Sequence, residues 1–348
     1  MGKVVVFTKP RTVGFESYDD PPLDPREVRL RTLYSGISAG TELTAYRGSN
    51  PYLHKQWDAA RKLFIPAEQP SLTYPVSGWG YEEVGEVVEL GNEVQDISIG
   101  DVIFGTWGHR THHIVAEDYA RDRVQAKSLD QIFGVFSHIG AIAINGVHDA
   151  RIRIGETVAV FGMGTLGQIV GQLVRKSGAK VVGIDRFEKR LEIALQSGAA
   201  DIVLNAGNGE VAEHIRVITD NRGADVAIEV TGSTIALNQA IRSVAYSAKV
   251  IALGFFQGEA SGMFLGEEFH HNRVNVVGSQ ISGTDPELTY RWNRLRLIQT
   301  FMGLQTDGLI DLKPIISHVI PFDNAGEAFR ILDQEPENAL QVVLDFTT

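Results

Sequence analysis

Three glycines near the middle of the chain give the clearest chemical signal. Gly162, Gly164 and Gly167 form a G-x-G-x-x-G pattern directly after an apolar run at 157–161. Glycines at this spacing permit a tight turn, bring bare backbone up to a pyrophosphate and seat the next helix against a sheet. The start of that helix offers free N–H groups and a positive dipole end to the phosphates. The pattern therefore predicts a dinucleotide site formed by Gly162, Met163, Gly164, Thr165, Leu166 and Gly167.

An acidic residue, Asp185, ends the next predicted strand. A carboxylate at this place accepts hydrogen bonds from the hydroxyls of the adenosine ribose and repels a 2′-phosphate, so we predict NAD rather than NADP as the cofactor. Arg186 follows directly and weakens this preference, because a guanidinium pairs readily with phosphate. Stacking on adenine and exposure to solvent are the alternatives for Arg186.

Further turns follow later predicted strands, in the stretches EVTGS (229–233), ALGFF (252–256) and VGSQ (277–280). Ligands of open parallel sheets bind outside the carboxyl ends of the strands. We therefore expect these turns to contact the nicotinamide half of the cofactor, through Thr231, Gly254 and Ser279.

The stretch GWGYEEVG, residues 78–85, places a tyrosine and two carboxylates just before an alternating strand. Three interpretations are open for it: a set of metal ligands, a metal-free acid/base site, or a tight turn. The chain contains no cysteine, so a disulfide and a thiolate zinc site are both excluded.

Two kinds of secondary structure must position these groups. Residues 1–125 alternate in short strands with Pro and Gly clusters between them, which predicts a small barrel-like β domain. Within it, residues 47–75 form a longer excursion. Trp57, Ala60, Leu63 and Phe64 recur there at helical spacing, so we expect a short helix that acts as a surface cover or as a flap over a cleft.

From residue 126 to 282, strands alternate with helical stretches, and each strand is apolar enough to be buried on both faces. This alternation predicts an α/β domain with a doubly wound parallel sheet of the Rossmann type. Residues 283–348 return to a mixed pattern, with a helix in NAGEAFRILDQ and a closing strand in QVVLDF.

The composition limits the function. The 348 residues are 43% hydrophobic and carry a formal charge of −11, which provides no electrostatic footprint for nucleic acid or for an anionic membrane. No run of about 18 apolar residues exists, and the N-terminus begins as a strand rather than as a signal peptide. We expect a cytoplasmic protein that binds a small molecule.

The layout resembles the medium-chain dehydrogenase/reductase superfamily, which includes the zinc alcohol, sorbitol and threonine dehydrogenases. The resemblance rests on the glycine motif and on SGISAGTEL (35–43), GYEEVGEVVELG (80–91), IGDVIFG (99–105) and ISHVIPFDNAGEAFRIL (316–332). It implies a GroES-like β-barrel catalytic domain at 1–125, a Rossmann domain at 126–282 and a return to the catalytic domain at 283–348.

The resemblance also assigns positions to the ligands of the family's catalytic zinc. Ser38 stands where the family has cysteine, Tyr81 where it has histidine, and the third ligand position falls at His138. Serine and tyrosine hydroxyls bind zinc weakly, so we expect no catalytic zinc. The resemblance implies that Ser38, Tyr81, Glu82 and His138 converge, and we expect His138 and Tyr81 to share the proton of an alcohol.

Structural alternatives exist for each of these residues. His138 follows Ser137, a plausible helix N-cap, and so could simply occupy a first helical turn. Tyr81 could fill the vacated metal space as a core tyrosine, and Glu82 could pair with a buried arginine.

Polar residues near the expected cleft suggest the class of substrate. The resemblance places Trp107 and His109 at a wall of the substrate pocket, and His270 near the nicotinamide end. Such groups favour a sugar, cyclitol or polyol over a hydrocarbon alcohol, although histidines on strand edges are often merely solvated. The predicted substrate contacts are Thr41, Trp107, His109 and His270.

Two other functions remain open. Zinc-free members of the superfamily often reduce C=C bonds as quinone or enoyl reductases, but these usually prefer NADPH and lack an acid at the position of Asp185. A nucleotide-responsive binding protein without catalysis is the third possibility. The alternating stretch 274–282 has the length of an edge strand that pairs across a homodimer.

Overall fold

The structure, a computed structural model, describes residues 1–66 and 68–348. Its contacts divide the chain into a discontinuous unit, residues 1–138 with 317–348, and a continuous unit, residues 139–316. Within the described residues, no helix is both long and apolar enough to span a membrane.

Both boundaries lie later in the chain than the sequence suggested, at 138/139 and 316/317 instead of 125/126 and 282/283. The first differs because the 3-10 helix η2 (Gln131–Phe136) packs on the first unit: a Cβ added at Gly134 would lie 2.8 Å from the Cβ of Val84. The second differs because the chain after α8 (Arg294–Thr306) stays with the continuous unit. There, the Gln172 amide donates to the carbonyl of Asp311 at 2.8 Å and accepts from its N–H at 2.8 Å.

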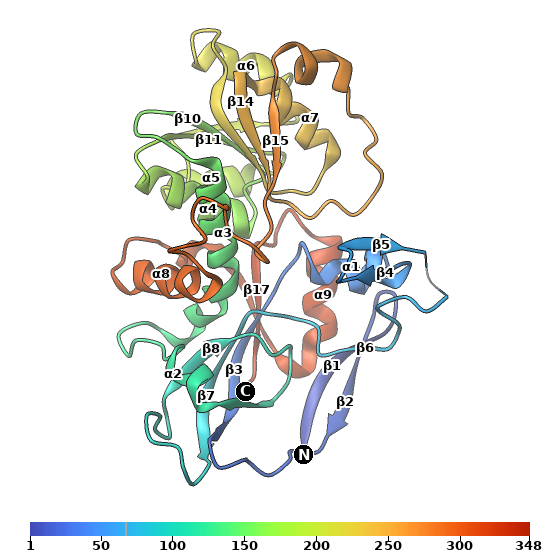
Figure 1. The fold of residues 1–348 in the computed structure, drawn as a ribbon, viewed down its shortest axis with the longest axis vertical. Coiled ribbons are helices and arrows are strands. Elements are labelled where there is room, and N and C mark those ends of the chain that lie inside the picture. The colour runs from blue at the N-terminus through green and yellow to red at the C-terminus, as the bar shows by residue number, and fades with distance from the viewer. Residues whose placement is uncertain (67) are drawn as a thin grey trace. The chain divides into compact units, whose positions relative to one another are not determined.

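The continuous unit contains a parallel sheet with the strand order β12-β11-β10-β13-β14-β15 (Figure 1). The order reverses between β10 and β13, which makes the carboxyl ends of these two strands the expected ligand crevice. The predicted Rossmann fold is therefore confirmed. The strands are β10 (Thr157–Phe161), β11 (Lys180–Asp185), β12 (Ile202–Asn205), β13 (Ala224–Glu229), β14 (Val244–Ala252) and β15 (Asn275–Gly278).

Amphipathic helices connect these strands and cover the sheet. Apolar side chains of α6 and α7, among them Ile215 and Ile241, pack in one cluster with Phe161 and Val250 of the sheet. The helices are α3 (Ser137–Ala150), whose first two residues belong to the discontinuous unit, α4 (Thr165–Lys176), α5 (Glu188–Gln196), α6 (Val211–Ile218) and α7 (Thr234–Ser243).

The edge strands of this sheet differ from the prediction that every strand is buried on both faces. Most of β15 is exposed, and Val276 retains 38% of its accessible surface. All residues of β12 are only partly buried. The reason is position: a strand at the edge has a neighbour on one side only, and apolar composition alone does not distinguish it from a central strand.

The discontinuous unit is β-rich, as predicted. In its larger sheet, strand β3 pairs with β7, β9 and the C-terminal β17. The C-terminal strand thus lies in the same sheet as β3. The strands are β1 (Gly2–Lys9), β2 (Thr12–Tyr18), β3 (Glu27–Ile37), β6 (Val76–Ser77), β7 (Glu83–Leu90), β8 (Val102–Gly105), β9 (His112–Ala116), β16 (Ile316–Pro321) and β17 (Gln341–Asp345).

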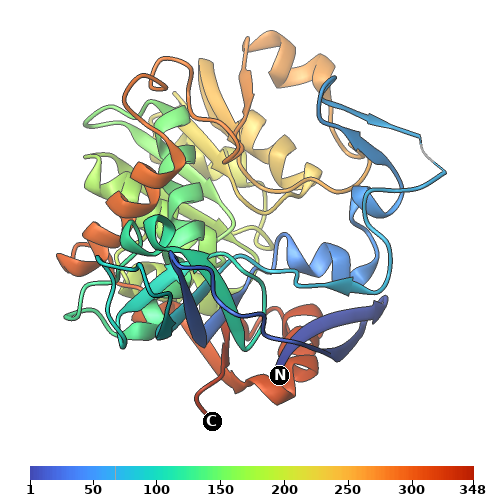
Figure 2. The ribbon, with the colours of Figure 1, turned by 60° about the horizontal axis from the view of Figure 1, so that its bottom comes forward.

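Helix α9 (Ala325–Gln334) packs against β1, although more than 300 residues separate them in the sequence (Figure 2). The ring of Phe329 lies 4.9 Å from that of Phe7 and 5.5 Å from that of Tyr46 on α1 (Glu42–Arg47). These side chains belong to a buried core that also includes Ile37 of β3 and Leu43 of α1, and this core holds α1 in place next to the candidate site. The remaining short elements are η1 (Pro51–Leu53), α2 (Glu117–Arg121), η4 (Lys313–Ile315) and η5 (Phe322–Asn324).

The helix expected in the excursion 47–75 is wrong: the chain forms a hairpin of β4 (Gln56–Asp58) and β5 (Leu63–Ile65). The carboxylate of Asp58 accepts from the N–H groups of Ala60 and Arg61, which closes a turn and competes with a helix. Trp57 pairs with Phe64 across the hairpin, with ring centroids 4.9 Å apart. Apolar spacing alone could not separate these two outcomes.

Candidate active site

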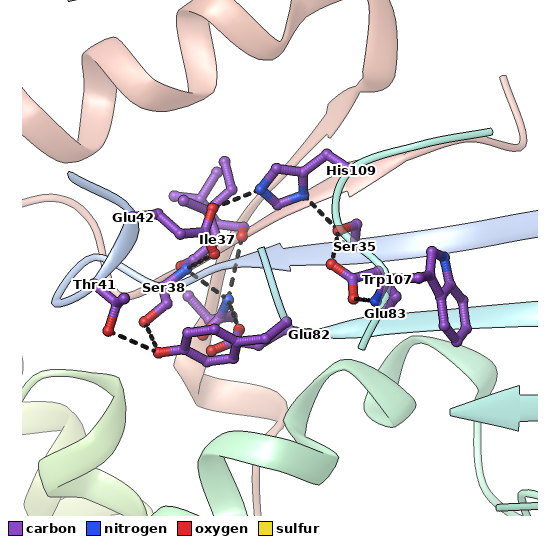
Figure 3. A network of polar contacts seen from close by, with 12 residues as sticks. Ser35, Ile37, Ser38, Thr41, Glu42, Glu82, Glu83, Trp107 and His109 are labelled. Atoms are coloured by element: carbon purple, nitrogen blue, oxygen red, sulfur yellow. Dashed lines mark hydrogen bonds and ion pairs between the residues drawn. The ribbon is translucent and has the colours of Figure 1, made fainter. Parts of the chain in front are cut away.

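Three hydroxyl groups of the discontinuous unit meet at one point, and we call Ser38, Thr41 and Tyr81 the hydroxyl cluster. Ser38 and Thr41 lie in the turn between β3 and α1, as Figure 3 shows. Tyr81 precedes β7, and its Oη hydrogen-bonds with the Ser38 hydroxyl and donates to the Thr41 hydroxyl at 3.2 Å. The sequence prediction that Ser38 and Tyr81 converge agrees with this geometry.

The GWGYEEVG stretch is a turn that delivers Tyr81 to this place. Gly78 and Gly80 adopt positive φ angles of 64° and 134°, which L-residues rarely adopt. A Cβ at Gly80 would lie 3.0 Å from the imidazole of His109, so the close approach also favours glycine there. The stretch is therefore a tight turn, and this turn places Tyr81 beside Ser38 and Thr41.

His138 lies next to the hydroxyl cluster, against Tyr81. Its ring packs edge-on against the Tyr81 ring, with centroids 4.8 Å apart and an interplanar angle of 70°. His138 is buried at the second position of α3, and Ser137 is not an N-cap there, because α3 directly continues η2, whose N-cap is Asp130. Tyr81 and His138 are thus adjacent, as expected.

The surroundings of Tyr81 bear on the expectation that Tyr81 and His138 share the proton of an alcohol. Burial raises the pKa of Tyr81 above its usual value, and the charge of Glu82 raises it further; the hydrogen bonds with Ser38 and Thr41 offset this only in part. The Tyr81 hydroxyl is therefore protonated near neutral pH and can donate a hydrogen bond, as it does to Thr41.

Glu82 is completely buried and makes no hydrogen bond with the hydroxyl cluster among those that the structure shows. One carboxylate oxygen accepts from the Gln341 amide of β17 at 2.9 Å, and the other has no hydrogen-bond partner among the described residues. Burial raises the pKa of Glu82 well above its usual value, with the charges of Glu42 and Glu83 adding to the effect. Its partner is an amide rather than the arginine considered from the sequence.

Trp107 and His109 are core residues, which contradicts their predicted place at the wall of a substrate pocket. The indole N–H of Trp107 donates to Thr32 at 3.0 Å, and its ring packs with Val28, Leu30 and other buried side chains. His109 is completely buried and contacts Glu42 and Ser35. The family resemblance placed these residues after a strand of the β domain, but it did not reveal the buried partners that hold them in the core.

The glycine turn of the continuous unit has the geometry that a dinucleotide requires. Gly162 has a φ of 101°, and a Cβ at Gly167 would collide with the carbonyl oxygen of Gly162. Gly164 precedes α4 without any side-chain cap, so the first N–H groups of the helix remain available to a phosphate. A Cβ at Gly164 would meet only the Arg190 guanidinium, at 3.6 Å, which leaves the approach to the backbone open. Thr165 and Leu166 form the first turn of α4.

Asp185 is held in place at the end of β11. Its carboxylate accepts from the N–H groups of Met163 at 2.8 Å and Phe187 at 3.0 Å. Each oxygen keeps a second lone pair that suits a ribose hydroxyl. The guanidinium groups of Arg186 and Arg190 lie 4.7 and 4.9 Å from the centre of the Phe187 ring, so cationic groups are also present at this end of the site.

The turns after β13 and β14 are joined by a residue that the sequence analysis missed, Glu229. Its carboxylate accepts from the N–H of Thr231 at 2.7 Å, and its carbonyl accepts from the N–H of Gly254 at 2.9 Å. Ser279 is tied to the end of β14 by a bond from its N–H to Ala252 at 3.0 Å. The sequence could have indicated Glu229, because this acidic residue ends a strand in the same way as Asp185 does.

His270 lies far from these turns within the same unit. It follows η3 (Leu265–Phe269) and precedes β15, at the edge of the parallel sheet opposite to the glycine turn. There, the carbonyl of Asn272 accepts from Ser247 in the first half of β14. His270 is exposed, and its position does not fit the predicted contact near the nicotinamide.

Comparison with known proteins identifies the family of this chain. The zinc-binding dehydrogenase family model matches residues 165–298. D-guloside 3-dehydrogenase of Shigella flexneri is 31% identical over 352 residues, covering 99% of this chain and 100% of that enzyme. The chain belongs to the medium-chain dehydrogenase/reductase superfamily.

Other members of the superfamily share the fold along the chain. (R,R)-butanediol dehydrogenase of Bacillus subtilis is 24% identical, over 90% of this chain and 91% of that enzyme. A crystal structure of the 2R,3R-butanediol dehydrogenase of this species superposes with a TM-score of 0.78 at 21% identity over 99% of both chains. A putative zinc-binding dehydrogenase from Sinorhizobium meliloti, bound to NADP, gives a TM-score of 0.77 at 22% identity over 99% of both chains.

The residues at the superfamily's zinc positions do not fit a catalytic zinc ion. Ser38 and Tyr81 supply neutral hydroxyl groups that are hydrogen-bonded with each other, and hydroxyls bind zinc poorly beside thiolate or imidazole. His138 is the one imidazole of the three. Among the described residues, no group of three or more His, Asp or Glu side chains is arranged to hold a metal ion.

Proposed function

We propose that this protein is a zinc-independent, NAD-dependent dehydrogenase that oxidises a secondary alcohol of a sugar, cyclitol, polyol or glycoside, or reduces the matching ketone. The observation that carries the proposal is the hydroxyl cluster with the His138 ring packed against Tyr81, in a chain that also has a dinucleotide turn. The names of the related enzymes, which refer to a guloside and to butanediol, support a polyhydroxylated substrate.

The proposed mechanism assigns a separate task to each side chain. Tyr81 stays protonated because burial raises its pKa, and in the substrate complex its O–H donates to the substrate oxygen in place of Thr41. His138 accepts the proton of the alcohol, since an imidazole exchanges protons near neutral pH. Ser38 orients the Tyr81 hydroxyl, and the partly buried Thr41 connects the cluster with water. The bound nicotinamide supplies or accepts the hydride.

The cofactor is proposed to be NAD because the Asp185 carboxylate favours ribose hydroxyls and repels a 2′-phosphate. Gly162, Gly164 and Gly167 are proposed to hold the pyrophosphate, while Thr231, Gly254 and Ser279 contact the nicotinamide half. A fluorescence titration tests the preference: NADH should bind at least about tenfold more tightly than NADPH. The reverse order would contradict it.

Substitution of the two proposed proton-handling residues tests the mechanism. Tyr81→Phe and His138→Phe should each reduce kcat at least about 100-fold, because general acid–base groups contribute about 10²–10⁴-fold. Exposed residues of the same types, Tyr290 and His214, provide matched controls as Tyr290→Phe and His214→Phe. A loss below about threefold in both test variants would remove Tyr81 and His138 from the mechanism.

A substrate screen separates the proposal from its rivals. NAD-dependent turnover of glycosides or polyols, unchanged after dialysis against a chelator, is the expected result. Stoichiometric zinc at Ser38, Tyr81 and His138 in active enzyme would contradict the metal-free mechanism. Turnover of enones with NADPH alone would identify a C=C reductase, and tight NADH binding without turnover would identify a nucleotide-responsive binding protein.

A further inference from the structure

A carboxylate and an imidazole pair in the core directly behind the hydroxyl cluster (Figure 3). His109 Nε2 and Glu42 Oε2 are 2.6 Å apart, and both side chains are fully inaccessible to solvent. Burial lowers the pKa of His109, but the charge of Glu42 and its hydrogen bond outweigh this, so the net shift is upward. Two apolar side chains of similar volume often give a fold the same stability as a buried ion pair. Stability alone therefore does not explain why this pair is present.

The second oxygen of Glu42 connects this pair to the candidate site. Glu42 Oε1 accepts from the backbone N–H of Ser38 at 2.9 Å, while the N–H of Glu42 donates to the Ser38 carbonyl at 2.9 Å. These two bonds clamp the turn that carries both Ser38 and Thr41. Tyr81 Oη reaches the hydroxyls of Ser38 and Thr41 only when this turn keeps its shape.

Further hydrogen bonds fix the imidazole end of the pair. His109 Nδ1 lies 2.6 Å from the hydroxyl of Ser35 on β3, and that hydroxyl donates to Glu83 on β7 at 3.1 Å. Glu83 in turn accepts from the N–H of Trp107 at 2.6 Å. Figure 3 shows this chain of contacts from Glu42 to Trp107, which anchors the turn to two strands of the sheet.

The hydrogen bond between Glu42 and Ser38 indicates what the Glu42–His109 pair contributes to the site. The contact between Glu42 and Ser38 is a backbone amide N–H, which does not release its proton near neutral pH and so transmits position rather than protons. We propose that Glu42 and His109 are positioning residues that hold the Ser38 backbone, so that the Ser38 and Thr41 hydroxyls both reach Tyr81. The catalytic consequence rests on the proposed dehydrogenase function, whereas the structural claim does not.

Two substitutions of Glu42 separate positioning from a role of the charge. Glu42→Gln keeps an acceptor for the Ser38 N–H and a polar group facing His109, so kcat should stay within about threefold with an unchanged pH profile. Glu42→Leu removes the acceptor, and kcat should fall about 100-fold, since a shift of about 1 Å in a catalytic group has this effect. If Glu42→Gln loses as much as Glu42→Leu, or shifts the pH profile, the positioning role is wrong.

His109 should act through the same bond. His109→Leu is expected to lower kcat, and the double variant with Glu42→Leu should lose no more than the Glu42→Leu variant alone, because both act on one turn. Full additivity of the two losses would contradict a shared action. Glu117 offers a matched control, since it is buried in the same unit and its carboxylate accepts from the N–H groups of Gln95 and Asp96. Glu117→Leu should lower the Tm without lowering kcat by more than about threefold.

Hydrogen exchange tests the positioning role of Glu42 without any measurement of enzyme activity, and so independently of the proposed dehydrogenase function. Hydrogen exchange at the Ser38 amide should be slow in the wild type and in Glu42→Gln, and at least about tenfold faster in Glu42→Leu. If the wild type shows no dehydrogenase activity but the exchange pattern holds, the proposed function fails while the structural role of Glu42 stands. Equal exchange in all three proteins would overturn the inference even if the enzyme is active.

Discussion

At the scale of single residues, Glu83 shows how burial couples protonation to stability. Burial raises the pKa of Glu83 to about 7, although the charge of His109 and the bond from the Trp107 N–H oppose this. In the unfolded chain the same carboxyl ionises near 4.5. The contribution of the bound proton to stability is therefore fully present below pH 4.5 and is lost as the pH rises to about 7.

The titration of Glu83 predicts that stability depends on pH, and a neutral residue at this position should remove that dependence. The shift corresponds to about 3 kcal/mol, so the free energy of unfolding of the discontinuous unit should fall by up to about this amount over that window. Glu83→Gln should flatten the decline. Urea unfolding followed by tryptophan fluorescence measures it in a Trp292→Phe background, which leaves Trp57, Trp79 and Trp107, all within the discontinuous unit. An equal slope in both proteins would contradict the assignment to Glu83.

The sequence predicted the residues of the hydroxyl cluster better than the residues behind it. Ser38 and Tyr81 were found because they replace known ligands of a familiar motif. His109 and Trp107 were misplaced because the resemblance gives their position in the chain but not their partners: Glu42 and Ser35 hold His109 in the core, and Thr32 accepts from the Trp107 indole. The role of Glu42 depends on contacts among residues up to 67 positions apart, which no local pattern encodes.

At the scale of elements, the turn between β10 and α4 contains glycines that are needed for different reasons. Gly167 is needed for packing, because a Cβ there would collide with the Gly162 carbonyl. Gly164 meets no such obstacle within the chain, and so we propose that its missing side chain gives room to an approaching phosphate.

Alanine substitutions test this division. Gly167→Ala should lower the Tm and weaken NADH binding, whereas Gly164→Ala should weaken binding at least about tenfold while the Tm changes little. Gly266→Ala provides a control in the same unit, because a Cβ there would have no neighbour within 4 Å. Thermal denaturation and NADH fluorescence give the two values. Unchanged affinity in Gly164→Ala would show that the pyrophosphate does not approach this backbone.

The elements themselves were largely predictable, and the failures have physical causes. Alternating strands and helices with glycine-rich turns identified the parallel sheet, since its periodicity is local and repeated. The hairpin at 56–65 was missed because the Asp58 side chain closes a turn that apolar spacing does not reveal. The alternating stretch 274–282 indicated an edge strand, but the partial exposure of β12 at the other edge was missed, because strand order in a sheet follows from tertiary pairing.

At the scale of the whole molecule, the open edge of β15 supports the proposal of a homodimer. The strand ends the order of its sheet, and Val276 is exposed upon it. Val276→Lys should shift the assembly toward the monomer, because a charged residue on an edge strand opposes pairing between chains. Light scattering with size-exclusion chromatography at micromolar concentration measures this. A wild-type protein that is already monomeric under these conditions would contradict the homodimer.

The pairing of β17 with β3 also determines when each part of the chain becomes able to fold. A ribosome releases β3 and β7 long before β17, so the growing polypeptide exposes an unpaired edge of β3 for most of its synthesis. During the same interval Glu82 has not yet met Gln341, its hydrogen-bond donor. Residues 139–316 have no such dependence on the last strand and can mature while translation continues. Protection by a nascent-chain chaperone would therefore matter most for the first 138 residues.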